Sequence, residues 1–157
     1  MASPDLTTDR LRLRPTSWRG IPLIWSLLSN PSMRRYPGGV VLLQDRPRTI
    51  RRYLGGDLNV WTIRAPRPIS LVFPSRPAGA APPELSFQVH PRAWGRGYAF
   101  EACAAVRDHA LGPMSHGRVV AETQTLNLPS RRLLECLGFT LAGAATRFGT
   151  EQAIYTT

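Results

Sequence analysis

The first thirty residues contain two different spacings of apolar side chains. Over residues 6–15, leucines at positions 11 and 13 alternate with arginines, and this period of two predicts a half-buried strand that ends at Pro15. Over residues 21–28, apolar residues recur three and four positions apart around Pro22, which suits the first turn of a helix. The pattern therefore predicts a strand followed by an amphipathic helix.

The middle of the chain is predicted to add a helix and two short strands. The helix begins at Asp45, a candidate N-cap, and ends at the glycine pair 55–56. Strands over residues 59–64 and 69–73 flank a proline-rich turn. Residues 74–83 contain four prolines, one glycine and three alanines, so we expect a loop there, inside a single domain.

The second half of the chain alternates strands and helices. Its expected elements are a strand over 84–89, a helix over 97–111, a strand over 117–125, a helix over 129–137 that ends at Gly138, and two further strands from Phe139 onward. One face of the longest helix carries Tyr98, Ala102, Cys103, Val106 and Ala110. This order of elements predicts an α/β domain in which helices flank one mixed sheet.

Length and composition limit the classes of protein to consider. The 157 residues suffice for one domain, residues 1–157, and 43% of them are hydrophobic, too many for a disordered chain. No apolar run reaches the ~18–20 residues that cross a bilayer, and the N-terminus has no apolar signal core. Cys103 and Cys136 lack the spacing of a zinc site or a disulfide scaffold. We therefore expect a protein of the reducing cytoplasm, with no membrane association and no bound metal.

The charge balance is unusual. All 20 basic residues are arginines, and against 10 acidic residues they give a formal net charge of +10. This excess favours an anionic partner such as RNA, an acidic protein surface or a phosphorylated cofactor. A codon bias toward arginine, with charge that is merely solvated, explains the same numbers, so both interpretations stay open.

The segment with the clearest chemistry joins the strand at 84–89 to the helix at 97–111. Its glycines and arginines precede a helix N-terminus, where free N–H groups and the positive end of the helix dipole attract an anion such as a phosphate. The absence of lysine excludes a P-loop, and Phe100 stands where a dinucleotide fingerprint needs its last glycine. The spacing that fits is Arg92-x-x-Gly95-x-Gly97-x-Ala99.

That spacing resembles the acetyl-CoA pyrophosphate loop of the GNAT N-acetyltransferase superfamily. Similar motifs of its branch with the ribosomal-protein-alanine N-acetyltransferases occur in the same order at residues 8–15 (TDRLRLRP), 84–87 (ELSF), 91–102 (PRAWGRGYAFEA) and 127–139 (NLPSRRLLECLGF). The resemblance covers most of the chain and is weak between residues ~40 and 80. It implies a single-domain GNAT fold, with a mixed, mostly antiparallel sheet of about six to seven strands flanked by about four helices.

The resemblance also implies direct transfer of an acetyl group from acetyl-CoA to a primary amine. Because only a neutral amine can attack, a general base is required, and Glu84, at the start of its strand, is the candidate. Ser130 is the candidate to protonate the leaving thiolate or to orient a water that does so, since Leu134 occupies the position where many family members carry a tyrosine. The alternatives are a strand-end glutamate in an ordinary ion pair and a serine that caps a helix.

The same resemblance assigns a set of cofactor-binding residues. Backbone N–H groups of the loop would hold the pyrophosphate, one near Val89 would stabilise the oxyanion, and Asn127 would bond the pantetheine amides or cap its helix. The assigned residues are Val89, Arg92, Gly95, Arg96, Gly97, Tyr98, Ala99 and Asn127. Glu101 is expected to complement the helix dipole. The histidines at 90, 109 and 116 show no metal spacing and are expected in the core or on the surface.

The acceptor and two rival functions stay open at the level of sequence. The amine belongs either to a protein N-terminus or to a small molecule, and the acyl group is acetyl or longer. Without the tyrosine, the chain also fits a regulatory module that binds acyl-CoA without catalysis, although such a module has no need of Glu84. The positive charge fits a basic RNA-binding protein or an enzyme associated with the ribosome, including one that acetylates aminoacyl-tRNA. Because dimers are frequent in the family, the resemblance includes a homodimer among the expected assemblies.

Overall fold

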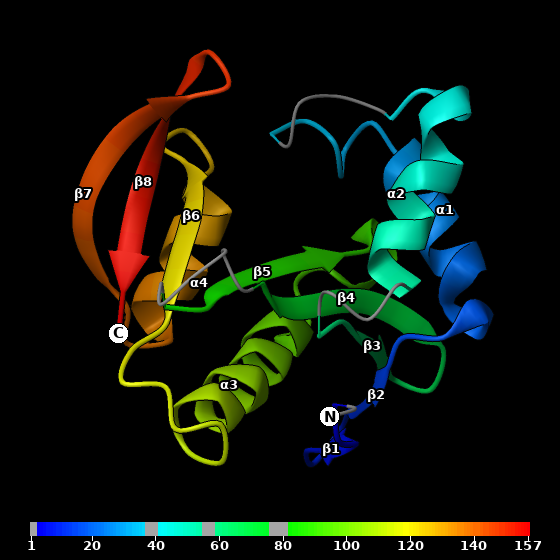
Figure 1. Ribbon diagram of the computed structural model, residues 1–157, viewed down its shortest axis with the longest axis horizontal. Coiled ribbons are helices and arrows are strands. Elements are labelled where there is room, and N and C mark those ends of the chain that lie inside the picture. The colour runs from blue at the N-terminus through cyan, green and yellow to red at the C-terminus, as the bar shows by residue number, and fades with distance from the viewer. Residues whose placement is uncertain (1–2, 37–40, 55–58, 76–81) are drawn as a thin grey trace.

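The computed structural model describes residues 3–36, 41–54, 59–75 and 82–157, and these form one eight-stranded sheet with helices on both faces (Figure 1). The strands are β1 (Leu6–Thr7), β2 (Arg12–Pro15), β3 (Trp61–Arg64), β4 (Pro68–Ser75), β5 (Glu84–Val89), β6 (Val120–Gln124), β7 (Thr140–Arg147) and β8 (Thr150–Thr156). The α-helices are α1 (Ile21–Ser29), α2 (Arg46–Leu54), α3 (Tyr98–Leu111) and α4 (Leu128–Cys136). The strand order is β1-β2-β3-β4-β5-β6-β8-β7, and every neighbouring pair is antiparallel except β5 and β6. The predicted α/β class is confirmed.

The N-terminal strand predicted over residues 6–15 is divided in two. The Thr8 N–H donates to the Leu11 carbonyl oxygen at 3.0 Å, and the Leu11 N–H donates to the Thr8 hydroxyl oxygen at 3.0 Å. These bonds close a turn, so β1 folds back and pairs antiparallel with β2. The additional hairpin explains why the sheet has eight strands, where about six to seven were predicted.

Two predicted boundaries in the middle of the chain shift. Asp45 closes a short 3₁₀ turn, Leu43–Asp45, and α2 begins one residue after the predicted start, at Arg46. β4 continues to Ser75, which pairs with Glu84, so the loop expected over residues 74–83 is shorter than predicted. Residues 76–81 of that loop, and the glycine pair 55–56 expected to end α2, lie outside the described residues.

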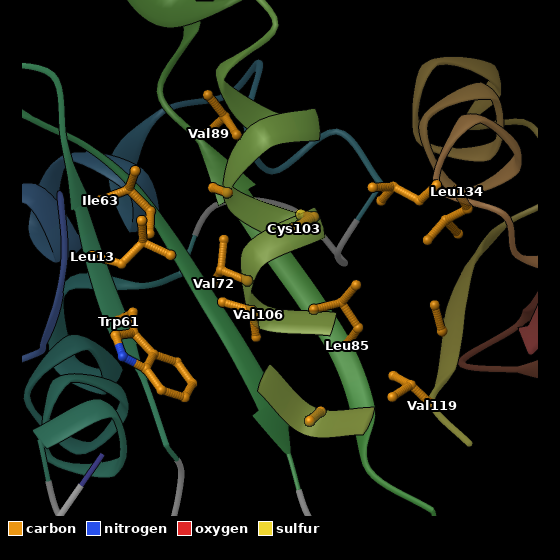
Figure 2. Close-up of a cluster of buried hydrophobic side chains, with 14 of the residues drawn as sticks. Leu13, Trp61, Ile63, Val72, Leu85, Val89, Cys103, Val106, Val119 and Leu134 are labelled. Atoms are coloured by element: carbon orange, nitrogen blue, oxygen red, sulfur yellow. The ribbon is translucent and has the colours of Figure 1, made fainter. Parts of the chain in front are cut away.

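The two faces of the sheet carry different helices. Leu71 of β4 packs with α1 and α2, whereas its neighbour Val72 packs with α3, because successive side chains of a strand point to opposite faces. Figure 2 shows the α3 side of the core, where Cys103 and Val106 meet Leu85 of β5. The helix face predicted from spacing is largely the buried one: Ala102, Cys103, Val106 and Ala110 are at most 1% exposed. Its packing fixes α3 across the sheet, with its N-terminus next to the end of β5.

β5 and β6 separate soon after they meet. Among the described residues, their register consists of the single parallel pair of Glu84 and Val120, whereas β5 pairs with β4 along its whole length. Beyond that pair the two strands diverge, as Figure 1 shows. Beyond Glu84, the edge of β5 that faces β6 is therefore not paired with a strand in the described parts of the chain. No helix in the described parts of the chain is both long and apolar enough to span a membrane.

Candidate active site

Two adjoining cavities occupy the region where β5 and β6 separate. The larger, of about 600 Å³, reaches from β5 to the first turns of α3 and α4. The smaller, of about 240 Å³, lies between β5 and β6. Because the two cavities have lining residues in common, they are parts of one cleft that passes between the strands. The shared lining residues are Tyr36, Phe87, Gln88, Asn127 and Ser130.

The register of β4 and β5 directs part of the β5 backbone into this cleft. The His90 N–H donates to the Ile69 carbonyl oxygen at 2.8 Å, so the backbone groups of His90 and, two residues earlier, Gln88 face β4. In an antiparallel ladder the intervening residues face the other way. The N–H groups of Phe87 and Val89 therefore point toward β6, where the strands have already separated. A molecule bound between the strands meets these donors.

The loop between β5 and α3 has the geometry of an anion site. Gly95 and Gly97 have φ angles of +71° and +74°, a left-handed conformation that other residues rarely adopt. Both glycines line the larger cavity, together with Tyr98 and Ala99. Gly97 is the N-cap of α3 and offers no side chain to the first N–H groups of the helix. These donors and the positive end of the helix dipole therefore lie beside the cavity.

The two arginines of this loop differ in placement. The Arg92 guanidinium donates to the Pro68 carbonyl oxygen, and neither Arg92 nor Arg96 is among the described residues that line the cleft. Arg96 is exposed beside the glycines, and its carbonyl oxygen accepts a hydrogen bond from Arg10 Nη1 at 2.9 Å. Both arginines are exposed, but the Arg92 guanidinium is held by the backbone, whereas the Arg96 guanidinium makes no hydrogen bond to the described residues.

Aromatic side chains form part of the wall of the larger cavity. Trp94 Nε1 donates to the Val89 carbonyl oxygen at 2.7 Å, which orients the indole although 52% of Trp94 is exposed. Phe87 and the partly exposed Phe100 line the same cavity. Exposed apolar side chains gathered at a cavity mark a binding surface, here one suited to the apolar parts of a ligand.

Asn127 and Ser130 lie together at the start of α4. Asn127 is the N-cap, and its Oδ1 accepts a hydrogen bond from the Ser130 N–H at 3.4 Å. Both residues also line both cavities. The capping alternative raised by the sequence is therefore present, and it occupies Oδ1 while the NH₂ group of Asn127 keeps two donors. Capping and contact with a ligand are compatible at this position.

Glu84 lies at the start of β5, at the closed end of the cleft, and is half-buried. Burial raises its pKa above the ordinary value and the nearby charge of Glu122 raises it further, while Arg147 partly offsets both effects. Arg147 Nη1 itself pairs with Glu122 Oε2 at 3.1 Å. Glu122 lines the smaller cavity, and Glu84 directly precedes its lining residues on β5. A carboxylate with a raised pKa is a stronger base than an ordinary one.

Several polar residues of the cleft were not singled out from sequence. Gln88 stands four positions after Glu84 and so shares its face of β5. Its Nε2 donates to the Tyr53 hydroxyl at 3.0 Å, and Gln124 Nε2 donates to the Tyr36 carbonyl oxygen at 2.5 Å. Strand alternation would have found Gln88. The segments that hold the two tyrosines carry no motif, so their place beside the cleft follows only from the fold.

Two of the histidines have structural partners. His90 Nδ1 accepts a hydrogen bond from the Arg92 N–H at 3.3 Å, and its Nε2 lies 3.1 Å from Ser26 Oγ. Burial and the charge of Arg92 lower the pKa of His90. His109 packs edge-on against the buried Trp61, with ring centroids 5.9 Å apart. These contacts stabilise a turn and the core.

The family model and the known sequences that are similar to this chain are all described as acetyltransferases or transacetylases. The model of a family described as "Acetyltransferase (GNAT) domain" matches residues 10–140. FsC-acetyl coenzyme A-N(2)-transacetylase of Aspergillus fumigatus is 35% identical over 57 residues, which span 36% of this chain and only 24% of that relative. An uncharacterized N-acetyltransferase of Bacillus subtilis is 22% identical over 142 residues, 88% of this chain and 84% of the relative.

Solved structures extend the similarity to the whole fold. An acetyltransferase of the GNAT family from Bacillus anthracis has a TM-score of 0.86 and 19% identity, with 98% of each chain covered. A ribosomal L7/L12 α-N-protein acetyltransferase, solved with coenzyme A, has a TM-score of 0.78 and 15% identity, with 98% of this chain and 97% of the other covered. At these identities the likeness establishes a shared fold.

Proposed function

The chain belongs to the GNAT acetyltransferase family, and we propose that it transfers an acetyl group from acetyl-CoA directly to a primary amine. The observation that carries this proposal is the cleft between β5 and β6. One part of it is lined by Gly95 and Gly97 of the loop, and the other lies beside Glu84. An anionic thioester donor and an amine acceptor can therefore meet between the separated strands.

We assign acetyl-CoA to the larger cavity. Its pyrophosphate would accept hydrogen bonds from backbone N–H groups between Gly95 and Ala99, with Arg96 adding positive charge and Arg92 contributing through its backbone. The NH₂ group of Asn127 would bond the pantetheine amides. The Val89 N–H, which points into the cleft, would donate to the acetyl carbonyl oxygen as negative charge develops on it.

The acceptor amine would enter from the other side of the cleft and lose a proton to Glu84. Glu84 stands five residues before Val89 on the strand, or roughly 16 Å at ~3.3 Å per residue, so the proton would pass along a chain of several water molecules. The amine nitrogen then forms a bond to the acetyl carbon, and the carbon–sulfur bond breaks. The raised pKa of Glu84 suits it to this role.

The sulfur of coenzyme A leaves as a thiolate and has to gain a proton. Ser130 lines both cavities and is our candidate to supply it or to orient the water that does, because Leu134 replaces the tyrosine of many family members. The proton taken by Glu84 and the one delivered to sulfur balance, so the products are the acetylated amine and free coenzyme A.

We propose a protein N-terminal α-amine as the first acceptor to test. The motifs at residues 8–15 and 91–102 resemble those of the ribosomal-protein-alanine branch. One structural neighbour is itself named as an α-N-protein acetyltransferase of ribosomal L7/L12. A small-molecule amine is the alternative acceptor, and the same assay separates the two.

Thermal unfolding tests the donor half of the proposal. The midpoint is measured with acetyl-CoA, with coenzyme A and with inorganic phosphate, each at about 1 mM. A ligand at 100 times its Kd stabilises the native state by about 2.7 kcal/mol, so we expect a clear rise with both CoA ligands and none with phosphate. If the midpoint stays the same with all three, the acetyltransferase function is wrong.

Release of free thiol tests the acceptor half. Peptides with free and with blocked N-termini, and a set of small primary amines, are incubated with acetyl-CoA and the protein. We expect thiol release that requires a free amine. Binding of acetyl-CoA without release for any amine would instead favour the regulatory acyl-CoA module.

A further inference from the structure

The motif at residues 8–15 has no part in the chemistry proposed above, yet it contacts the first turn of α3. Thr8 Oγ1 donates to Glu101 Oε1 at 2.5 Å, and the Arg10 N–H donates to the same oxygen at 3.0 Å. Arg10 Nε donates to Glu101 Oε2 at 2.6 Å. The turn between β1 and β2 is thereby joined to α3, although Arg10 and Glu101 are 91 positions apart.

From this anchor the Arg10 side chain continues into the glycine loop. Its Nη1 donates to the Arg96 carbonyl oxygen at 2.9 Å, and its guanidinium carbon lies 4.9 Å from the centroid of the Tyr98 ring. Between these two residues, a Cβ added to Gly97 would lie 3.3 Å from Arg10 Nη2. One side chain therefore contacts Arg96 and Tyr98 and passes close to Gly97 between them, where the loop becomes the helix.

The carboxylate of Glu101 is held in its charged form. Burial raises the pKa of Glu101, but the hydrogen bonds from Thr8 and Arg10 and the charge of Arg10 together outweigh that effect and lower the pKa. Arg10 consequently has its charge partner within the protein and does not depend on an anionic ligand to be ordered. The contacts join protein groups only, and they exceed the dipole role expected for Glu101 from sequence.

We infer that Arg10 and Glu101 are positioning residues that hold the loop at Gly95 and Gly97 in its binding conformation before acetyl-CoA arrives. The inference rests on the proposed function, because it takes this loop as the pyrophosphate site. A loop with two glycines has many conformations when free, and a ligand that needs one of them binds more weakly. Contacts that select that conformation in advance raise the affinity without touching the reacting atoms.

The exposure of Arg10 and Glu101 distinguishes a role in cofactor binding from a role in stability alone. The Arg10 side chain is 51% exposed and that of Glu101 18%, so solvent partly screens the ion pair and its contribution to the free energy of unfolding is moderate. The buried Leu11 and Leu13 carry the packing of this part of the chain. Loss of the Arg10 side chain should therefore change cofactor affinity more than stability.

The test compares Arg10→Ala with Arg14→Ala. Arg14 is the control, because it lies four residues later, on β2, and makes an exposed ion pair with Asp5 at 3.4 Å. We expect Arg10→Ala to raise the Kd of coenzyme A and the KM of acetyl-CoA about tenfold, with kcat at saturating acetyl-CoA close to the wild-type value. Glu101→Gln should act in the same direction, since it releases Arg10, and Arg14→Ala should change none of these quantities.

Hydrogen exchange of the amides at residues 95–99, in the absence of ligand, is the second readout. We expect faster exchange in Arg10→Ala than in wild type and in Arg14→Ala. Equal Kd values for the two variants, a loss of kcat with unchanged KM, or unaltered exchange would each overturn the inference. If Arg10→Ala does not fold, Arg10→Lys and Glu101→Gln decide by the same criteria. Wild-type protein that binds no coenzyme A overturns the proposed function as well, whereas normal binding by Arg10→Ala overturns this inference alone.

Discussion

Glu84 is the residue on which the proposed catalysis depends most directly. Glu84→Gln removes the base and keeps nearly the same shape, so we expect kcat to fall by about 100-fold or more, with the Kd of coenzyme A unchanged. In wild type, activity should rise with pH as Glu84 loses its proton, and burial shifts this rise toward neutral pH. Steady-state rates and calorimetric titration measure the two quantities. The exposed Glu151→Gln is the control, and equal kcat in both variants would remove Glu84 from the mechanism.

Stability as a function of pH distinguishes Glu84 from a glutamate in an ordinary ion pair. Its pKa is higher in the folded than in the unfolded chain, so the folded state holds the proton more tightly. Stability should then decrease as the pH rises from the unfolded pKa through the raised folded pKa. Glu84→Gln cannot ionise and should lack this decrease, which makes it the more stable protein at neutral pH. Urea denaturation at about pH 4 and about pH 7 measures this, and a less stable Glu84→Gln at neutral pH would indicate a stabilising ion pair.

At the scale of elements, the first turn of α4 combines a cap and a cleft wall in Asn127. Asn127→Ala removes both, whereas Asn127→Ser keeps an oxygen that can cap and removes the carboxamide NH₂ group. We expect only the alanine variant to lose stability, by about 1 kcal/mol, and both variants to bind coenzyme A more weakly. Chemical denaturation and calorimetric titration give the two values. Normal coenzyme A binding by Asn127→Ser would reduce Asn127 to a helix cap.

The elements also show which features the sequence determines. Helix α3 and strand β5 were predicted closely, because their apolar spacing is regular and both are packed into one core. The break between β1 and β2 was not predicted, since the alternation of leucines continues close to the turn that Thr8 and Leu11 close. A side-chain hydroxyl that accepts a hydrogen bond from a backbone N–H does not change the spacing of the apolar residues, so that spacing could not predict the turn.

The residues of the candidate site also fall into two groups, those with a local signal in the sequence and those without one. Gly95, Gly97 and Asn127 belong to short local motifs, so their types and spacing mark the loop and the helix start. Glu122 and Tyr36 reach the cleft only because β6 diverges from β5 and residues 32–36, after α1, pack beside the separated strands. Such contacts join residues far apart in the chain. They depend on tertiary packing, for which a single sequence carries no local signal.

At the scale of the whole molecule, positive charge is concentrated in one segment that borders the cleft. Residues 31–54 hold six arginines against one aspartate, a net charge of +5 and thus half of the formal +10 of the chain. This segment borders the larger cavity through Arg35 and Tyr36, of which Tyr36 also lines the smaller one, and α2 contacts β5 through the bond between Tyr53 and Gln88. An acceptor that approaches β5 from this side therefore meets a positive field. If the arginines reflect only a codon bias, this field plays no part in the choice of acceptor.

Acidic and neutral acceptor peptides distinguish these two explanations of the charge. Arg48 and Arg52 are exposed on α2, and the double variant Arg48→Gln, Arg52→Gln should raise the KM of an acidic peptide about fivefold at low salt while leaving that of a matched neutral peptide unchanged. The control is Arg118→Gln, Arg132→Gln, which removes the same charge from exposed positions outside residues 31–54. At about 0.5 M salt the difference should vanish, because ions screen charges over a few ångströms. If both double variants raise the KM equally, only net charge matters. If neither does, the arginines are solvated and play no part in acceptor choice.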